Sequence, residues 1–170
     1  MGKGFEVCRE MIQWIKDNIP TGNTILELGS GKGSTQHLCD DYILYSIEHE
    51  AKFLNKFKST YIHAPIKDDF YDPEILKIQL PKKYDLLLID GPPRKIYEDG
   101  VSRKVGRRGF MNYTDLFYLD CPIIIDDIDR GRERHLIEDL STMLNRKFIG
   151  IKGRDHRGKS TWFGLIEKKE

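Results

Sequence analysis

The sequence predicts a single α/β domain, residues 1–170, built on a doubly wound, mostly parallel sheet. Segments with helical and strand-like spacing alternate along the chain without repeats or a linker-like stretch. That order places helices on both faces of a parallel sheet. Residues 84–90 and 122–126 carry unbroken apolar runs instead of an alternation of polar and apolar residues. Strands of this kind are buried on both faces, as the central strands of a parallel sheet are.

The other elements follow from hydrophobic spacing and from turn residues. Apolar side chains at helical spacing predict an N-terminal helix within residues 1–20 that packs on the sheet. Residues 91–109 are predicted to form a long, mobile binding loop that closes over a ligand. Further strands are expected at 24–28, 43–47, 60–63, 147–151 and 161–167, and further helices at 34–40, 51–58, 73–80, 110–119 and 132–144.

The composition excludes several classes of protein. The 28 lysines and arginines nearly balance 27 acidic residues, so no global charge indicates binding to nucleic acid or to a membrane. No apolar stretch approaches the ~20 residues needed to span a bilayer, and the first residues lack the apolar block of a signal peptide. The three cysteines are far apart and form no CxxC pair. We therefore expect a cytoplasmic protein with free, buried thiols and no membrane partner.

A glycine-rich turn follows the first strand. Glycines at 29, 31 and 33 let the chain turn tightly and let a ligand approach the backbone N–H groups of the next helix. A Walker loop is excluded because Gly31 and Lys32 are followed by Gly33 instead of Ser or Thr. A dinucleotide fingerprint would need glycine where Ser34 stands. An NAD(P)-dependent oxidoreductase nevertheless stays open as an alternative.

The pattern Glu27-x-Gly29-x-Gly31-x-Gly33, with Glu48 at the end of the second strand, resembles the class I S-adenosylmethionine (SAM)-dependent methyltransferases. The resemblance implies their Rossmann-like fold, with seven strands and an antiparallel last strand, and SAM as cofactor. Glu48 would accept hydrogen bonds from both ribose hydroxyls, and Asp68 or Asp69 would bind the adenine amine. The expected cofactor contacts are Glu27, Gly29, Ser30, Gly31, Gly33, Ser34, Thr35, Glu48, His49, Asp68, Asp69 and Asp90.

Three aspartates are expected to meet at the tips of two strands. Asp90 ends one apolar strand and Asp126 and Asp127 end the other, and neighbouring strand tips lie about 5 Å apart. Carboxylates that close repel one another unless a cation lies between them, and oxygen ligands suit Mg²⁺ or another divalent ion. The arrangement resembles the metal-dependent catechol-type O-methyltransferases. The alternative is that Asp90 contacts the methionine amine of SAM. We expect Asp90, Asp126 and His156 to be the catalytic residues.

Basic residues gather in three segments that the topology brings to the ligand edge. Residues 91–110, 129–134 and 152–159 together hold 13 lysines and arginines against five acidic residues. Such a concentration attracts and orients an anionic acceptor. We expect methyl transfer to a hydroxyl of an anionic small molecule or sugar. The alternatives are an RNA or nucleotide methyltransferase and a non-catalytic module that binds cofactor or RNA. The expected acceptor-binding residues are Arg94, Lys95, Arg107, Arg108, Arg130, Arg154 and Arg157.

Overall fold

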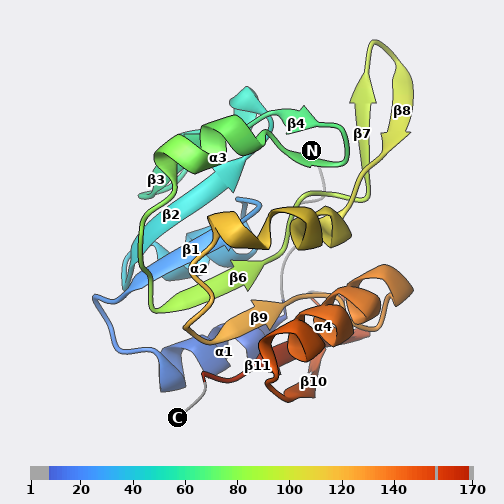
Figure 1. The fold of residues 1–170 in the computed structure, drawn as a ribbon. Helices are drawn as coiled ribbons and strands as arrows, with labels where there is room; N and C mark the ends of the chain where they lie inside the picture. The colour runs from blue at the N-terminus through green and yellow to red at the C-terminus, as the bar shows by residue number, and fades with distance from the viewer. Residues whose placement is uncertain (1–7, 156, 169–170) are drawn as a thin grey trace.

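Seven strands form one sheet in the order β10-β11-β9-β6-β1-β2-β3 (Figure 1). The computed structural model describes residues 8–155 and 157–168. Neighbouring strands pair in parallel except at β11, which is antiparallel to both β9 and β10. The predicted seven-stranded, mostly parallel sheet with an antiparallel last strand is confirmed. Its strands are β1 (Thr24–Leu28), β2 (Ile43–Glu48), β3 (Thr60–His63), β6 (Leu86–Ile89), β9 (Ile123–Ile125), β10 (Phe148–Arg154) and β11 (Ser160–Ile166).

Helices cover both faces of the sheet (Figure 1). Alternate residues of one strand point to opposite faces, so Ile25 of β1 packs with the N-terminal helix while Leu26 and Leu28 pack on the other side. Both clusters are apolar because β6 and β9, in the middle of the sheet, carry apolar residues at every position. One face holds α1 (Arg9–Asn18) and α2 (Ser34–Leu38); the other holds α3 (Pro73–Gln79), the 3-10 segment η2 (Arg107–Leu116) and α4 (Gly131–Leu144).

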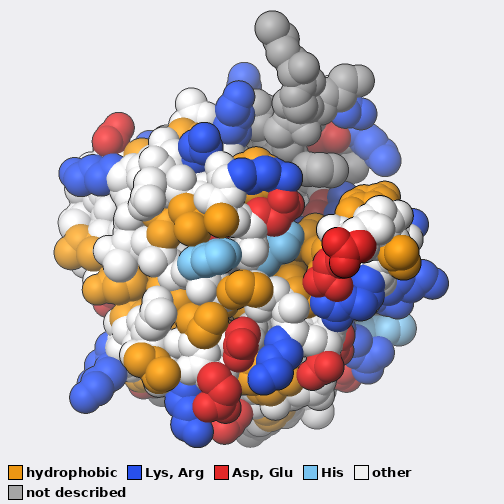
Figure 2. Space-filling model, turned by 90° about the horizontal axis from the view of Figure 1, so that it is seen from above, with side chains coloured by type: hydrophobic (Ala, Val, Ile, Leu, Met, Phe, Trp, Pro, Cys, Tyr) orange, Lys and Arg blue, Asp and Glu red, His pale blue; other side chains and the backbone are white. Residues whose placement is uncertain are grey.

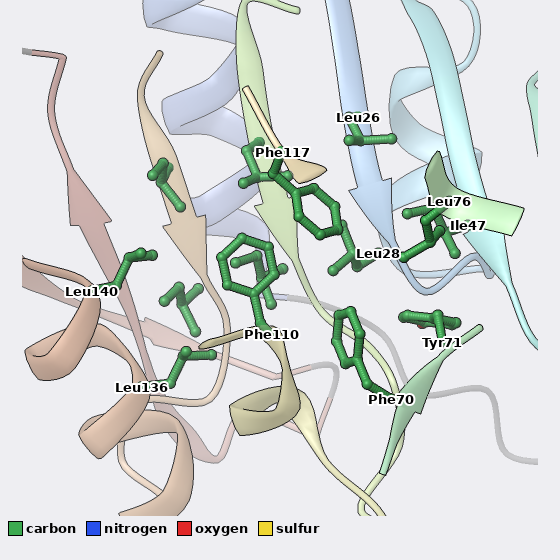
Figure 3. Packing of buried hydrophobic residues seen from close by; sticks show 14 of the residues in the cluster. Leu26, Leu28, Ile47, Phe70, Tyr71, Leu76, Phe110, Phe117, Leu136 and Leu140 are labelled. Atoms are coloured by element: carbon green, nitrogen blue, oxygen red, sulfur yellow. The ribbon is translucent and has the colours of Figure 1, made fainter. Parts of the chain in front are cut away.

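Aromatic residues fix η2 against the sheet. Phe110 and Phe117 lie with ring centroids 4.6 Å apart, and Phe110 also meets Phe70 edge-on at 6.2 Å. Figure 3 shows these rings beside Tyr71, in the layer between the sheet and the covering helices. Because Phe110 is fully buried, the residues just before it are held at the carboxyl edge of β6 and β9.

The structure corrects three expectations about local structure and shows one element that was not predicted. Residues 51–58 were expected to be helical, but only η1 (Ala51–Phe53) is a 3-10 turn and none of the eight residues is fully buried. Only Leu54 and Phe57 are partly buried, so the segment has little of the packing that supplies most helix stability. Residues 91–109 are not one open loop, since they contain the hairpin β7 (Lys95–Glu98) and β8 (Val101–Lys104). Residues 110–119 belong largely to η2, and a second hairpin, β4 (Ile66–Lys67) with β5 (Phe70–Tyr71), was not predicted.

The structure also bears on membrane insertion. Across residues 8–155 and 157–168, every helix is too short or too polar to pass through a lipid bilayer.

Candidate functional site

Two tight turns meet at the carboxyl edge, where a ligand crevice is expected in an open α/β sheet. Gly29 follows β1 with φ of +88°, a conformation that favours glycine. A Cβ atom on Gly29 would lie only 3.1 Å from the backbone nitrogen of Gly91, the second residue after β6. A Cβ atom on Gly91 would collide with the Tyr71 hydroxyl and lie 2.9 Å from Gly29. The two glycines therefore let the β1 and β6 turns touch backbone to backbone.

Glu27 is linked to the glycine turn by hydrogen bonds through side-chain hydroxyls. Its carboxylate is fully buried and accepts hydrogen bonds from the hydroxyls of Ser34, Thr35 and Ser46, each at 2.6 Å. Burial raises the pKa of Glu27, although the three hydroxyls oppose that shift. The Thr35 hydroxyl also accepts from the N–H of Gly31 at 2.9 Å. These hydrogen bonds among Glu27, Ser34, Thr35 and Gly31 hold the shape of the turn. The contacts of Glu27, Ser34 and Thr35 with the cofactor stay predictions.

Glu48 reaches the same turn from the neighbouring strand β2. Its Oε2 accepts from the Ser30 hydroxyl at 2.8 Å, and its Oε1 accepts from the N–H groups of His49 and Glu50 at 2.8 and 2.9 Å. Only 3% of Glu48 is exposed. Burial raises its pKa, but the His49 side chain and the other donors outweigh burial, so the net pKa lies below its usual value. Glu48 is therefore a preformed anion beside the glycine turn.

The Tyr71 hydroxyl lies where these turns converge. Tyr71 is fully buried, its oxygen is in contact range of Gly91, and it has no hydrogen-bond partner among the described residues. Burial raises the pKa of Tyr71 well above its usual value, and the charges of Glu48 and Asp90 raise it further. The neutral phenol therefore keeps its hydroxyl hydrogen and can donate a hydrogen bond. Buried hydroxyls rarely stay without a partner, so the Tyr71 hydroxyl is a candidate hydrogen-bond donor to a bound ligand.

The three predicted aspartates do come together. One carboxylate oxygen from each of Asp90, Asp126 and Asp127 lies within 4.8 Å of those of the other two. Burial raises the pKa of Asp90 to about 6, with Arg107 acting against the shift. Burial, and then the charge of Asp90, raise the pKa of Asp126 to about 8. These acids can hold protons near neutral pH.

A guanidinium group already lies among these carboxylates. Arg107 donates from Nη2 to Asp90 at 2.8 Å and to Asp127 at 3.2 Å, and from Nη1 to the carbonyl oxygen of Asp126 at 2.7 Å. Asp127 also pairs with Arg130 at 2.6 Å. The aspartates were expected to hold a divalent ion, but the charge between them comes from arginine. The donor set therefore does not fit a metal ion while Arg107 keeps this position.

The predicted acceptor-binding arginines are mostly engaged with carboxylates. Arg94 donates to buried Glu133 at 2.9 Å, and Arg108 pairs with Asp139 at 3.1 Å. Arg107 and Arg130 serve the aspartate cluster, as described above. Lys95 is exposed on β7, whereas Arg154 and Arg157 belong to β10 and to the turn that follows it. The predicted catalytic His156 lies outside the described residues. The structure thus splits the expected basic patch into separate ion pairs.

Asp68 and Asp69 form the turn of the β4–β5 hairpin. The carbonyl of Asp69 accepts from the N–H of Gly106 at 3.4 Å. Asp69 also lines a cavity of about 550 Å³ between this turn, the end of β8, η2 and α4. Their role at the adenine amine stays a prediction. The charged residues that line the cavity are Asp69, Lys104, Arg108, Arg132 and Asp139.

The surface above this region mixes both signs of charge. In Figure 2, the end of the molecule that carries the β7–β8 hairpin in Figure 1 shows basic side chains beside acidic and hydrophobic ones. The hairpin accounts for this mixture, because Lys95, Arg103 and Lys104 share it with Glu98 and Asp99. No single sign dominates the view. Such a surface is unlike the continuous basic stripe expected of a nucleic-acid-binding face.

Sequence reasoning missed two residues of the site. Gly91 had a signal, because a glycine directly after the aspartate that ends a strand often marks a close backbone approach. Tyr71 had none, since an aromatic residue in a short apolar stretch is indistinguishable from a core residue. Only the position of the β4–β5 hairpin brings its hydroxyl to the edge of β1 and β6.

No family model and no curated protein matches the sequence, but solved structures do. A candidate O-methyltransferase from Klebsiella pneumoniae aligns over 97% of this chain and 82% of that chain, with a TM-score of 0.67 and 15% identity. An O-methyltransferase from Bacillus cereus in complex with SAH aligns over 96% and 83%, with a TM-score of 0.65 and 14% identity. The methyltransferase MycE of the mycinamycin biosynthetic pathway, in complex with Mg and SAH, aligns over 95% and 45%, with a TM-score of 0.54 and 14% identity.

These likenesses extend over nearly the whole of this chain and so include its seven-stranded sheet with the antiparallel β11. The chain has the fold of the class I S-adenosylmethionine-dependent methyltransferases.

Proposed function

We propose that the protein transfers a methyl group from SAM to a hydroxyl of an anionic small molecule or sugar. The observation that carries the proposal is the convergence of Glu48, the Gly29–Gly91 contact and the Tyr71 hydroxyl at one edge of the sheet. A nucleoside ligand needs a carboxylate to accept hydrogen bonds from its ribose hydroxyls, and Glu48 offers one. It also needs space against the backbone and a hydrogen-bond donor, which the two glycines and Tyr71 would provide.

The residues fit the cofactor in three ways. Glu48 would bind the ribose, with a ribose hydroxyl replacing the Ser30 hydroxyl on its Oε2. The glycine turn leaves room for a ligand against the backbone. Tyr71 would donate its hydroxyl hydrogen to the bound cofactor, which would give this buried group the partner it lacks among the described residues. His49, next to Glu48, would stay its ion-pair partner at 2.9 Å.

The aspartates supply the proton chemistry. When bound, SAM supplies an electrophilic methyl group on a sulfonium centre. An acceptor hydroxyl must lose its proton as it takes that group, and Asp90 is the carboxylate in position, since its side chain is 24% exposed at the tip of β6. Its pKa, raised to about 6 mainly by burial, suits a general base near neutral pH. Asp126 and Arg107 would hold Asp90 in place.

The cavity lined by Lys104, Arg108 and Arg132 is the proposed site for the acceptor's anionic group. Gly106 lines this cavity, and the next residue, Arg107, donates a hydrogen bond to Asp90. The acceptor's anionic group would therefore bind close in sequence to the residue that contacts the proposed base. Guanidinium groups bind carboxylates and phosphates through paired hydrogen bonds, which favours an acidic sugar or a phosphorylated compound over a neutral one.

The alternatives have less support. The serine at position 34 that breaks the dinucleotide fingerprint is itself used, as a donor to Glu27, which weakens the case for an oxidoreductase. An RNA methyltransferase would be expected to have a continuous basic surface, whereas basic and acidic side chains lie side by side on the face shown in Figure 2. A purely binding role would not require the aspartates at the tips of β6 and β9.

The direct test is a methyl-transfer assay with methyl-labelled SAM and a panel of uronic acids, sugar phosphates, nucleotides and RNA. We expect label to pass to an anionic hydroxyl compound, and Asp90→Asn to reduce turnover by at least about 100-fold, as loss of a general base does. The matched control is Asp41→Asn, which breaks the surface ion pair with Lys16, away from the acceptor cavity, and should keep most of the turnover. Unchanged turnover in Asp90→Asn would refute its role as the base, and transfer to RNA alone would refute the proposed acceptor class.

A further inference from the structure

We propose that Arg107 is the resident cation of the aspartate cluster, so that Asp90, Asp126 and Asp127 work without a divalent metal. The inference rests on side-chain contacts and does not depend on the methyl-transfer activity proposed above. The cluster of three aspartates resembles a metal site, but in this proposal its cation is the arginine side chain.

Arg107 makes the contacts that a bridging ion would make. A single guanidinium joins the tip of β6, through Asp90, to the residues that follow β9, through Asp127 and the Asp126 carbonyl. Its exposed fraction is 7%. Planar N–H groups match carboxylate oxygens in fixed directions, so this arginine can orient the acids as well as neutralise them.

Two further contacts engage the carboxylates of the cluster. Asp127 has a second guanidinium, that of Arg130, at 2.6 Å. The carboxylate of Asp126 accepts the backbone N–H of Asp127 at 2.8 Å, in a turn where Asp127 has φ of +62°. Mg²⁺ needs oxygen ligands at about 2.0–2.1 Å in near-octahedral geometry. An ion bound to the Asp90 and Asp127 oxygens that Arg107 contacts would be a close neighbour of that guanidinium, and like charges repel.

The backbone holds Arg107 in this place. Gly106 donates its N–H to the Asp69 carbonyl at 3.4 Å, and the Gly109 N–H bonds back to the Gly106 carbonyl at 3.1 Å. Phe110 then enters the core (Figure 3). A Cβ atom on Gly109 would lie 2.9 Å from the Cβ of Phe70, so the segment packs tightly on the β4–β5 hairpin. Displacing Arg107 would therefore mean moving a segment that is anchored on both sides of it.

The test is direct measurement of Mn²⁺ binding to the full chain, by calorimetry and by the electron paramagnetic resonance signal of free Mn²⁺. We expect the wild-type chain to show no stoichiometric binding at millimolar Mn²⁺. One equivalent of Mn²⁺ per chain that is lost in Asp127→Asn would overturn the inference.

A pair of arginine variants adds a second readout. Arg107→Gln removes the resident cation, and we expect it to raise the affinity for Mn²⁺ at least tenfold over wild type. Arg108→Gln, the matched control, removes the neighbouring arginine from its surface pair with Asp139 and should leave Mn²⁺ binding unchanged. An equal gain in both variants would contradict the specific role of Arg107. Should Arg107→Gln fail to fold, the wild-type and Asp127→Asn titrations decide the matter alone.

Activity separates this inference from the proposed function. If methyl transfer is found, it should persist after treatment with EDTA, and loss of activity that Mg²⁺ restores would overturn the role of Arg107. If no methyl transfer is found while Mn²⁺ also fails to bind wild type, the proposed function fails and the inference about Arg107 stands.

Discussion

At the scale of single residues, the properties of the site depend on the hydrogen-bond partners of a few buried polar side chains. Glu27 lies in β1 and Glu48 ends the adjacent parallel strand β2, and the two carboxylates have different hydrogen-bond partners. Glu27 is enclosed by three hydroxyls and has a raised pKa, whereas Glu48 meets His49 and backbone N–H groups and has a lowered one. The first carboxylate therefore shapes the turn, and the second is the one available to bind a ligand.

Tyr71 provides the first prediction. Tyr71→Phe should weaken binding of S-adenosylhomocysteine by about 3–10-fold, because it removes one neutral hydrogen bond. Removing a hydroxyl without a described partner should leave the free energy of unfolding almost unchanged. Tyr84→Phe is the matched control, because among the described residues Tyr84 is the other buried tyrosine whose hydroxyl lacks a partner. Tyr84 precedes β6 and so lies at the opposite end of that strand from Asp90. Equal effects of the two variants on calorimetric affinity would contradict the role of Tyr71.

Asp126 predicts a dependence of stability on pH. Its folded pKa of about 8 lies above its ordinary value of 3.8, so the folded chain holds a proton that the unfolded chain releases. Stability from this group is complete below about pH 4 and is lost as the pH rises toward 8. Urea unfolding at several pH values should therefore show wild type losing stability relative to Asp126→Asn over that range. A difference between the two proteins that stays constant with pH would contradict the account.

At the scale of elements, the β1 and β6 turns are built to touch. Gly91→Ala should lower the free energy of unfolding by about 1–3 kcal/mol, because its Cβ would press on Tyr71 and Gly29. Gly131→Ala is the control. Position 131 begins α4 with no atom near its ideal Cβ, and alanine there should be neutral or slightly stabilising. Urea denaturation of both variants checks the difference, and equal stabilities would show that the close approach is unimportant.

The sequence predicted the elements that bury apolar residues and failed where structure depends on distant contacts. β6 and β9 could be predicted from their apolar runs, and the aspartates at their tips followed from the topology. The β7–β8 hairpin could not, since its residues are mostly exposed and polar. Residues 51–58 had helical spacing but little surface to cover. Arg107 looked like a member of a basic loop, because nothing near it in the sequence reveals the carboxylates it meets.

At the scale of the whole molecule, the sheet gathers residues far apart in the chain at one edge. Gly29, Glu48, Tyr71, Asp90 and Asp126 come from different segments, and parallel pairing brings the strand ends together. The nearly neutral chain has its charges arranged as local pairs instead of one basic field. That arrangement supports the proposal of a small anionic acceptor over a long polyanion.

Calorimetric titration of the full chain with S-adenosylhomocysteine, alongside NADH, tests the central claim most directly. The account predicts one equivalent of S-adenosylhomocysteine bound with a Kd on the order of micromolar, corresponding to about 8 kcal/mol, and no binding of NADH. Glu48→Gln should weaken that binding by at least about tenfold, since it removes a charged acceptor of the ribose hydroxyls. Binding of NADH alone, or of neither compound, would contradict the account.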